Sequence, residues 1–123
     1  MKATRPLEYV CFFPISVPTK EGDAYVFLSV DVFSDFAFNT GVETNDDPEN
    51  ILKHIYLLTE HPYFTKHIKA GFTLVLHKYK GLEPRINSII KPLNGNVLFD
   101  GQYVNKVMVP VLKNIFRHTD KPL

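Results

Sequence analysis

The feature that most constrains the fold is an apolar run between Tyr25 and Phe38, the longest in the chain and rich in valine, phenylalanine and tyrosine. These residue types favour a pleated and largely buried strand. The run is broken at residues 31–35, Asp-Val-Phe-Ser-Asp, whose aspartates and serine favour a turn. We therefore predict two neighbouring antiparallel strands, at residues 24–32 and 35–43, joined by a very tight turn.

A further strand is predicted before this hairpin, at residues 8–17. The segment 7–13, Leu-Glu-Tyr-Val-Cys-Phe-Phe, has apolar side chains on both faces, which is typical of a central strand. Pro14 and Pro18 favour a strand end or an edge position. The polar segment 19–23 predicts a turn, so the first three strands form a meander.

The middle of the chain alternates helix and strand. Asp46 or Asp47 is a good N-cap and Pro48 suits the first helical position, so we predict a helix from there to His61–Pro62. Residues 62–69 are interpreted as a connection and residues 72–77 as a fourth strand. A strand, a long helix and another strand form a crossover, which implies a parallel pair in a mixed sheet.

The last third contains a short helix, a short strand and a long helix. We predict the short helix at residues 82–91 and a fifth strand at 96–100. Apolar residues then recur at three and four positions, which predicts an amphipathic helix: Val104, Val107, Met108, Val111, Leu112, Ile115 and Phe116. Pro110 is expected to kink this helix or to delay its start. The predicted order is β-β-β-α-β-α-β-α, a mixed five-stranded α/β (α+β) sheet with three helices.

Size and charge place the chain among ordinary globular proteins. Its 123 residues predict one domain, residues 1–123, and with no zinc-binding or helix-turn-helix segment it fits a fragment of a longer protein. With 14 basic and 13 acidic residues, the net charge of +1 gives no overall attraction to nucleic acid. The single cysteine, Cys11, fits a reducing cytoplasm, and no run of residues is long enough to span a membrane.

The element order is that of the ribonuclease H-like fold, and several segments resemble the integrase catalytic core of retroviral integrases and insertion-sequence transposases. They are residues 8–10 (Glu-Tyr-Val), 19–22 (Thr-Lys-Glu-Gly), Tyr25, and 30–34 (Val-Asp-Val-Phe-Ser), where Asp35 replaces the arginine that follows in the family. Residues 76–81, Leu-His-Lys-Tyr-Lys-Gly, are similar to the segment of the family that carries Asp-x-Gly. The resemblance covers residues 7–116.

The resemblance implies three carboxylates that bind two divalent metal ions. The first position corresponds to Phe12 or Phe13, the second to Tyr79, and the third to a residue between Val109 and Lys113, where no acid stands. None of these side chains binds magnesium, which prefers oxygen ligands. We therefore expect a core that keeps the fold without catalysis, cofactor or metal. An enzyme with a rearranged acid set, Asp31, Glu83 and Asp100, is the alternative.

Other chemistry-bearing residues have simpler interpretations. Asp31 is expected to hydrogen-bond the backbone of its turn. Cys11 is expected to be a buried, inert thiol. The histidines do not have the spacing of zinc ligands: His54, His61, His67, His77 and His118.

Basic residues form two candidate DNA contacts. Lys106, Lys113 and Arg117 share one stripe of the last helix. Lys78, Lys80, Arg85 and Lys91 follow the fourth strand, and the resemblance implies that both regions face DNA. The alternative is a normal solvated surface.

Two functions remain open from the sequence. The first is a non-catalytic integrase-like or transposase-like domain that contributes DNA contact or assembly in DNA integration or transposition. The second is a protein–protein interaction module, with a homodimer expected because integrase cores dimerise through helices.

Overall fold

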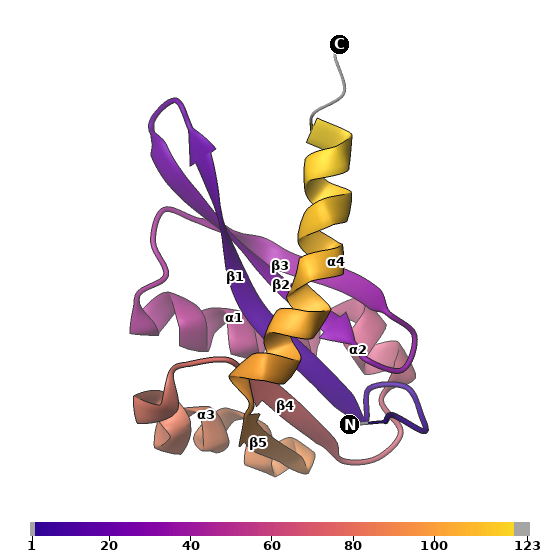
Figure 1. Ribbon diagram of the computed structural model, residues 1–123. Helices are drawn as coiled ribbons and strands as arrows, with labels where there is room; N and C mark the ends of the chain where they lie inside the picture. Colours follow the sequence, from indigo (N-terminus) through magenta and orange to yellow (C-terminus); the bar gives the residue numbers. More distant parts are fainter. Residues whose placement is uncertain (1, 120–123) are drawn as a thin grey trace.

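The computed structural model describes the backbone of residues 2–119 and the side chains of residues 2–114 (Figure 1). The strands are β1 (Tyr9–Thr19), β2 (Gly22–Asp31), β3 (Phe36–Glu43), β4 (Phe72–Leu76) and β5 (Gly95–Phe99). The helices are α1 (Pro48–Glu60), α2 (Pro62–His67), α3 (Glu83–Ile90) and α4 (Gly101–Thr119). Two 3₁₀ turns, η1 (Lys80–Leu82) and η2 (Lys91–Leu93), flank α3.

The five strands form one mixed sheet in the order β3-β2-β1-β4-β5. β2 pairs antiparallel with both β1 and β3, whereas β4 pairs parallel with β1 and β5. This confirms the predicted hairpin, the parallel pairing and the central position of the first strand. Asp31 pairs with Phe36 across the hairpin, so the turn contains four residues, 32–35, and is two residues longer than the predicted strand bounds left for it.

β1 continues through both of its prolines, which the sequence placed at a strand end or edge. Its pairing with β4 runs only from Tyr9 to Phe12, whereas its pairing with β2 runs on to Thr19. Beyond Phe12 one side of β1 is therefore an open edge, which is where a sheet tolerates proline. The prediction of an edge was right for this half of the strand, and the prediction of a central strand was right for the other half.

Several predicted boundaries need correction. Residues 62–67 form α2 instead of a connection, because Pro62 starts a new helix and the His61 side chain accepts a hydrogen bond from the Tyr63 backbone N–H at 3.1 Å. α4 begins at Gly101, so Pro110 lies inside the helix and does not delay its start. The observed order is therefore β-β-β-α-α-β-α-β-α.

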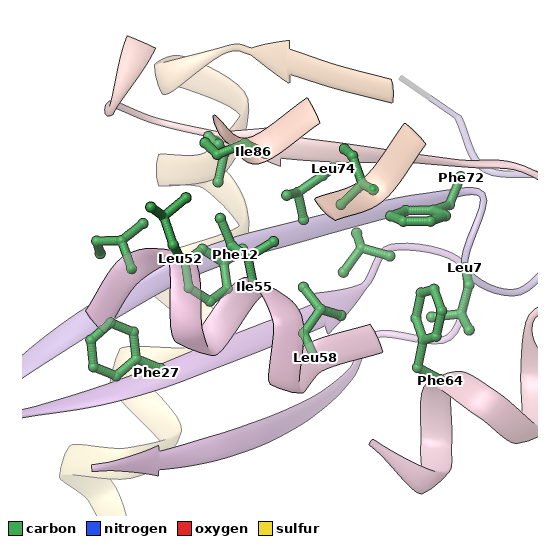
Figure 2. Packing of buried hydrophobic residues seen from close by; sticks show 14 of the residues in the cluster. Leu7, Phe12, Phe27, Leu52, Ile55, Leu58, Phe64, Phe72, Leu74 and Ile86 are labelled. Carbon is green, nitrogen blue, oxygen red and sulfur yellow. The ribbon is translucent and has the colours of Figure 1, made fainter. Parts of the chain in front are cut away.

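Helices cover the two faces of the sheet unequally. Because side chains alternate along a strand, Phe12 points to the face covered by α1, α2 and α3, and Phe13 points to the face covered by α4. Figure 2 shows the first core, which brings Phe12 of β1 and Phe27 of β2 together with Leu52 and Ile55 of α1. The second core is smaller and contains one fully buried residue from the described part of α4, Val104. In Figure 1 the last turns of α4 stand clear of the other ribbons.

No helix in the described part of the chain is long and apolar enough to cross a membrane.

Candidate functional site

The candidate site lies where β4 and β5 end and α4 begins. Both strands run parallel to β1, so their carboxyl ends reach the same edge of the sheet, where α/β proteins commonly bind ligands. The Asp100 backbone N–H donates to the Leu76 carbonyl at 2.9 Å, and its Oδ1 accepts from the Tyr103 N–H at 3.0 Å. Asp100 therefore caps α4 and joins its start to the end of β4.

The first resembled metal-ligand position is occupied by apolar rings. Phe12 and Phe13 are both fully buried. Phe12 stacks with Phe27 at a centroid distance of 6.1 Å, on the face away from α4. Phe13 lies on the α4 face beside Cys11 and Val75. Of the two residues left open by the sequence, Phe13 is the one that shares a face with α4.

The second position, Tyr79, is also aromatic. It has a left-handed backbone (φ 77°) and precedes the 3₁₀ turn at Lys80. Its ring makes an edge contact with His77 at 5.9 Å, and the Lys78 ammonium lies 5.1 Å from its centroid. Burial, followed by the negative charge of Asp46, raises the pKa of Tyr79 above its ordinary value of 10.0. The phenol therefore stays protonated at neutral pH and is a poor ligand for a hard cation.

The third position lies on the outer half of α4. Val109 is half exposed, and Pro110 and Lys113 are exposed. Val111 and Leu112 pack against the second core. The segment offers no carboxylate toward the sheet.

The alternative acid set, Asp31, Glu83 and Asp100, is not assembled. Among the described side chains, no three His, Cys, Asp or Glu residues come close enough to hold a metal ion. Glu83 lies in the first turn of α3, and Asp100 caps α4. These acids therefore serve separate local structures.

Asp31 forms the hydrogen bonds that its turn position predicts. Its Oδ1 accepts from the backbone N–H groups of Leu7 (3.0 Å) and Phe33 (3.1 Å). Its Oδ2 accepts from the hydroxyls of Ser34 (3.1 Å) and Tyr63 (2.7 Å). These four bonds engage both oxygens of a fully buried side chain, so the predicted structural role is confirmed.

Three of the four basic residues that follow β4 are held by side-chain partners. Lys78 Nζ lies 3.9 Å from Asp46 Oδ2, and Arg85 Nη2 lies 2.8 Å from Glu49 Oε1 at the start of α1. Lys91 Nζ donates to Asn96 Oδ1 at 2.8 Å. Lys91 and Lys80 have no ion pair within the described part of the chain, and Lys80 has no side-chain partner there at all. Local acids therefore reduce the positive potential of this region.

The α4 stripe remains the stronger candidate for polyanion contact. Lys106 and Lys113 are both exposed and lie two turns apart. The side chain of Arg117, the third predicted member, lies outside the described residues. Lys106 also borders a groove of about 430 Å³ between α4 and the β2–β3 hairpin, lined in addition by Val30, Asp35, Tyr103, Val107, Pro110, Val111 and Asn114.

Tyr103 and Asp35 are the groove residues that sequence reasoning missed. Burial, followed by the electrostatic effect of the neighbouring acidic groups, which include Asp35 and Asp100, raises the pKa of Tyr103. Tyr103 stands four residues before Val107, so its place in the apolar period of α4 was its only sequence signal. Burial, followed by the Asp100 charge, raises the pKa of Cys11 to about 12, as expected for an inert thiol.

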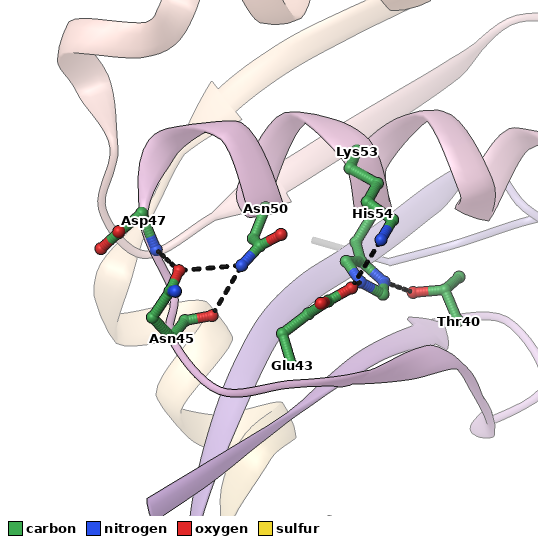
Figure 3. Close-up of polar contacts among 7 residues, drawn as sticks. All are labelled: Thr40, Glu43, Asn45, Asp47, Asn50, Lys53 and His54. Carbon is green, nitrogen blue, oxygen red and sulfur yellow. Dashed lines mark hydrogen bonds and ion pairs between the residues drawn. The ribbon is translucent and has the colours of Figure 1, made fainter.

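Outside this region, a polar network ties β3 to α1 (Figure 3). His54 is almost fully buried and stacks on Phe27 at 4.1 Å. Its Nδ1 lies 2.6 Å from Thr40 Oγ1, and its Nε2 lies 2.7 Å from Glu43 Oε2, which also accepts from Lys53 at 2.9 Å. These bonds engage both ring nitrogens of His54 within the core.

Solved structures similar to the chain include the following two. One is a chain of the cryo-EM structure of the simian T-cell lymphotropic virus intasome in complex with PP2A regulatory subunit B56 gamma. It matches with a TM-score of 0.72 and 8% identity over 100% of this chain and 46% of that chain. The other is the HTLV-2 integrase catalytic core domain in complex with magnesium, in a dimeric form. It matches with a TM-score of 0.63 and 9% identity over 99% of this chain and 80% of that chain.

No family model and no curated protein matches the sequence. The chain spans about half the length of the intasome chain that it resembles. At such low identity the likeness shows the fold alone. The chain therefore has the mixed five-stranded, ribonuclease H-like fold of the retroviral integrase catalytic core, as the sequence predicted.

Proposed function

We propose that this chain is a non-catalytic core of the integrase type that contributes DNA contact or assembly in a DNA integration or transposition protein. The proposal depends mainly on one observation: the integrase-like fold is combined with buried or apolar side chains at the positions where the resemblance implies metal-binding acids. Phe13 and Tyr79 take the first two positions, and the third lies in a segment of α4 without an acid. Two aromatic side chains at these points favour a scaffold over a two-metal enzyme.

Duplex DNA contact is assigned to the exposed lysines of α4. Lys106 and Lys113 stand free of ion pairs within the described residues, unlike Lys78 and Arg85. A contact of this kind reads the phosphate backbone without sequence preference and weakens steeply with salt.

Fluorescence anisotropy of a labelled duplex, at low and moderate salt with magnesium present, tests this assignment. We expect saturable binding, and we expect Lys106→Ala with Lys113→Ala to lower the slope of log K against log salt by about 2. The matched control is Lys2→Ala with Lys20→Ala, which removes the same charge from exposed positions away from α4. Equal losses in the two double variants would contradict a specific role for α4.

The absence of catalysis has its own test. We expect the purified chain to leave supercoiled plasmid and labelled duplex ends intact in magnesium or manganese. Metal-dependent nicking or strand transfer would overturn the non-catalytic assignment.

A protein-contact module is the second candidate function. It is favoured by Val109, which is 48% exposed between the two lysines of α4, and one similar structure is a dimeric form. If no duplex binds at low salt, sedimentation velocity of the chain against its Val109→Asp variant would test self-association through α4.

A further inference from the structure

The tight turn between β2 and β3 presents two large aromatic side chains to solvent. Phe33 is 49% exposed and Phe36 is 47% exposed, although turns of this kind usually carry small or polar residues. Neither phenylalanine belongs to either core, so each exposes a large apolar side chain that packing does not require.

The turn holds these rings in a fixed position. Asp31 bonds the Phe33 backbone N–H through its carboxylate, and its carbonyl accepts from the Asp35 N–H at 2.8 Å. The Tyr63 hydroxyl donates to Asp31 Oδ2 at 2.7 Å, which joins the turn to α2. The aromatic side chains are therefore presented by a preorganised backbone, which lowers the entropic cost of binding.

The rings form a short stack. Phe36 lies 4.5 Å from Tyr63 with an interplanar angle of 30°, and Tyr63 lies 4.5 Å from His67. Phe38 supports the stack from the core and is itself buried. Phe36 also stacks with Phe38 at 6.3 Å, yet it remains 47% exposed, so part of its ring is accessible to another flat ring.

The charges beside the stack suit a polyanion. Residues 61–69 contain Lys66 and Lys69, both exposed, and no carboxylate. The nearest acid, Asp31, is fully buried and accepts from the Tyr63 hydroxyl at 2.7 Å, and Asp35 lines the groove beside Lys106 and α4. Lys66 and Lys69 make no ion pair within the described part of the chain, and an aromatic platform next to such lysines is an arrangement by which proteins bind single-stranded nucleic acid.

We propose that Phe36, Tyr63 and His67 form a platform that stacks unpaired nucleobases, while Lys66 and Lys69 contact the adjoining phosphates. The inference rests on the proposed function, since it names unpaired DNA as a second ligand of the same DNA-contacting domain. It assigns that ligand to the β2–β3 turn and α2, apart from the duplex contact on α4.

Two labelled probes separate base stacking from phosphate attraction. One is an oligonucleotide of about twelve thymidines, a length that falls within the usual size of a single-strand binding site. The other is an abasic strand of the same length. Anisotropy at moderate salt is expected to give at least about tenfold tighter binding of the thymidine strand, because only that strand has rings to stack.

Variants at the turn locate the contact. Phe36→Ala is expected to weaken thymidine-strand binding about tenfold and to leave abasic binding unchanged, whereas Phe36→Tyr keeps wild-type affinity. Tyr56→Ala is the matched control, because Tyr56 is 52% exposed on α1 and makes no ring contact within the described residues. Circular dichroism checks that each variant is folded.

The failures of the two proposals are distinguishable. If thymidine and abasic strands bind equally, or if Phe36→Ala and Tyr56→Ala behave alike, the platform is refuted while duplex binding through Lys106 and Lys113 stands. If neither strand nor duplex binds at low salt, both proposals fail. If Phe36→Ala changes the sedimentation of the chain but not its DNA binding, the patch is a protein contact and the inference is overturned.

Discussion

Asp31 is a charged side chain at a fully buried position, and four donors surround its two oxygens. The donors come from Leu7 before β1, from the turn itself and from Tyr63 of α2. One carboxylate therefore joins three segments that are distant in sequence. Each such bond adds only modest net stability to the fold. Removing the acceptor is more costly, because each buried donor is then left with neither a protein partner nor water.

We expect Asp31→Asn to lower the free energy of unfolding by about 2–3 kcal/mol, because the amide nitrogen cannot accept the Ser34 and Tyr63 hydroxyls. Urea denaturation followed by circular dichroism measures the change. Asp23→Asn is the matched control, since Asp23 is exposed at the other end of the same strand. Similar values for the two variants would contradict the structural role of Asp31.

Glu43 gives a prediction on pH. The hydrogen bond from His54, followed by that from Lys53, holds its pKa below the ordinary value of 4.5. A carboxylate with a lowered pKa in the folded state stabilises the fold above its unfolded pKa, and this stabilisation is lost as pH falls through the folded pKa. We expect wild-type stability to fall below pH 4.5 more steeply than that of Glu43→Gln.

Urea denaturation over a series of acidic pH values checks this expectation. Glu21→Gln, at an exposed position in the β1–β2 turn, should retain the wild-type slope. A slope in Glu43→Gln as steep as that of the wild type would show that this contact does not contribute to acid sensitivity.

Single residues also mark the limit of sequence reasoning. The role of Asp31 was predictable because its turn is local. The pairing of Arg85 with Glu49 joins residues 36 positions apart and depends on how α3 packs beside α1. The basic residues after β4 were therefore predicted as candidate DNA contacts, and only the fold reveals that Lys78 and Arg85 pair with acids.

At the scale of elements, periodicity located the strands and the long helices. It failed for α2, because residues 62–67 are too few for an apolar period and the preceding proline looked like an end of helix α1. The structure shows that Pro62 both ends one helix and starts the next. The prolines of β1 indicated an edge, but where that edge begins, beyond Phe12, depends on the short length of β4 and could not be predicted locally.

The prediction at the scale of elements concerns Pro110 and the stability of α4. It interrupts α4 at an exposed position, where it removes one backbone hydrogen bond without filling a core. We expect Pro110→Ala to raise the free energy of unfolding by about 1–3 kcal/mol. Thermal and urea unfolding measure the gain, with Val109→Ala as a neighbouring exposed control of small effect. A loss of stability in Pro110→Ala would mean that the proline ring packs in the adjacent groove.

At the scale of the whole molecule, the order of elements carried the fold prediction. Periodicity gave five strands and three helices, and the resemblance to integrase cores gave their arrangement. The side chains of the candidate site were harder to predict from the sequence, because neighbours such as Tyr103 and Asp35 come together only when α4 lies across the sheet. The aromatic platform was not predicted from the sequence for the same reason, because Phe36 and Tyr63 lie on separate elements.

The unequal cover of the two faces predicts how the molecule opens. α4 covers Cys11, yet Val104 is its one fully buried residue among those described. Elements with few buried contacts detach at a lower free energy than the whole fold unfolds. We therefore expect Cys11, the single cysteine, to react with a thiol reagent through local release of α4.

The labelling rate of Cys11, compared with that of the unfolded chain, gives the free energy of the opening that exposes it. We expect this value to lie below the free energy of unfolding from urea denaturation, and Val104→Ala to accelerate labelling. Asp31→Asn should lower global stability yet leave labelling nearly unchanged, because its bonds join β1, the β2–β3 turn and α2 and none reaches α4. Equal free energies from labelling and urea, with both variants acting alike, would mean instead that α4 and the sheet open as one cooperative unit.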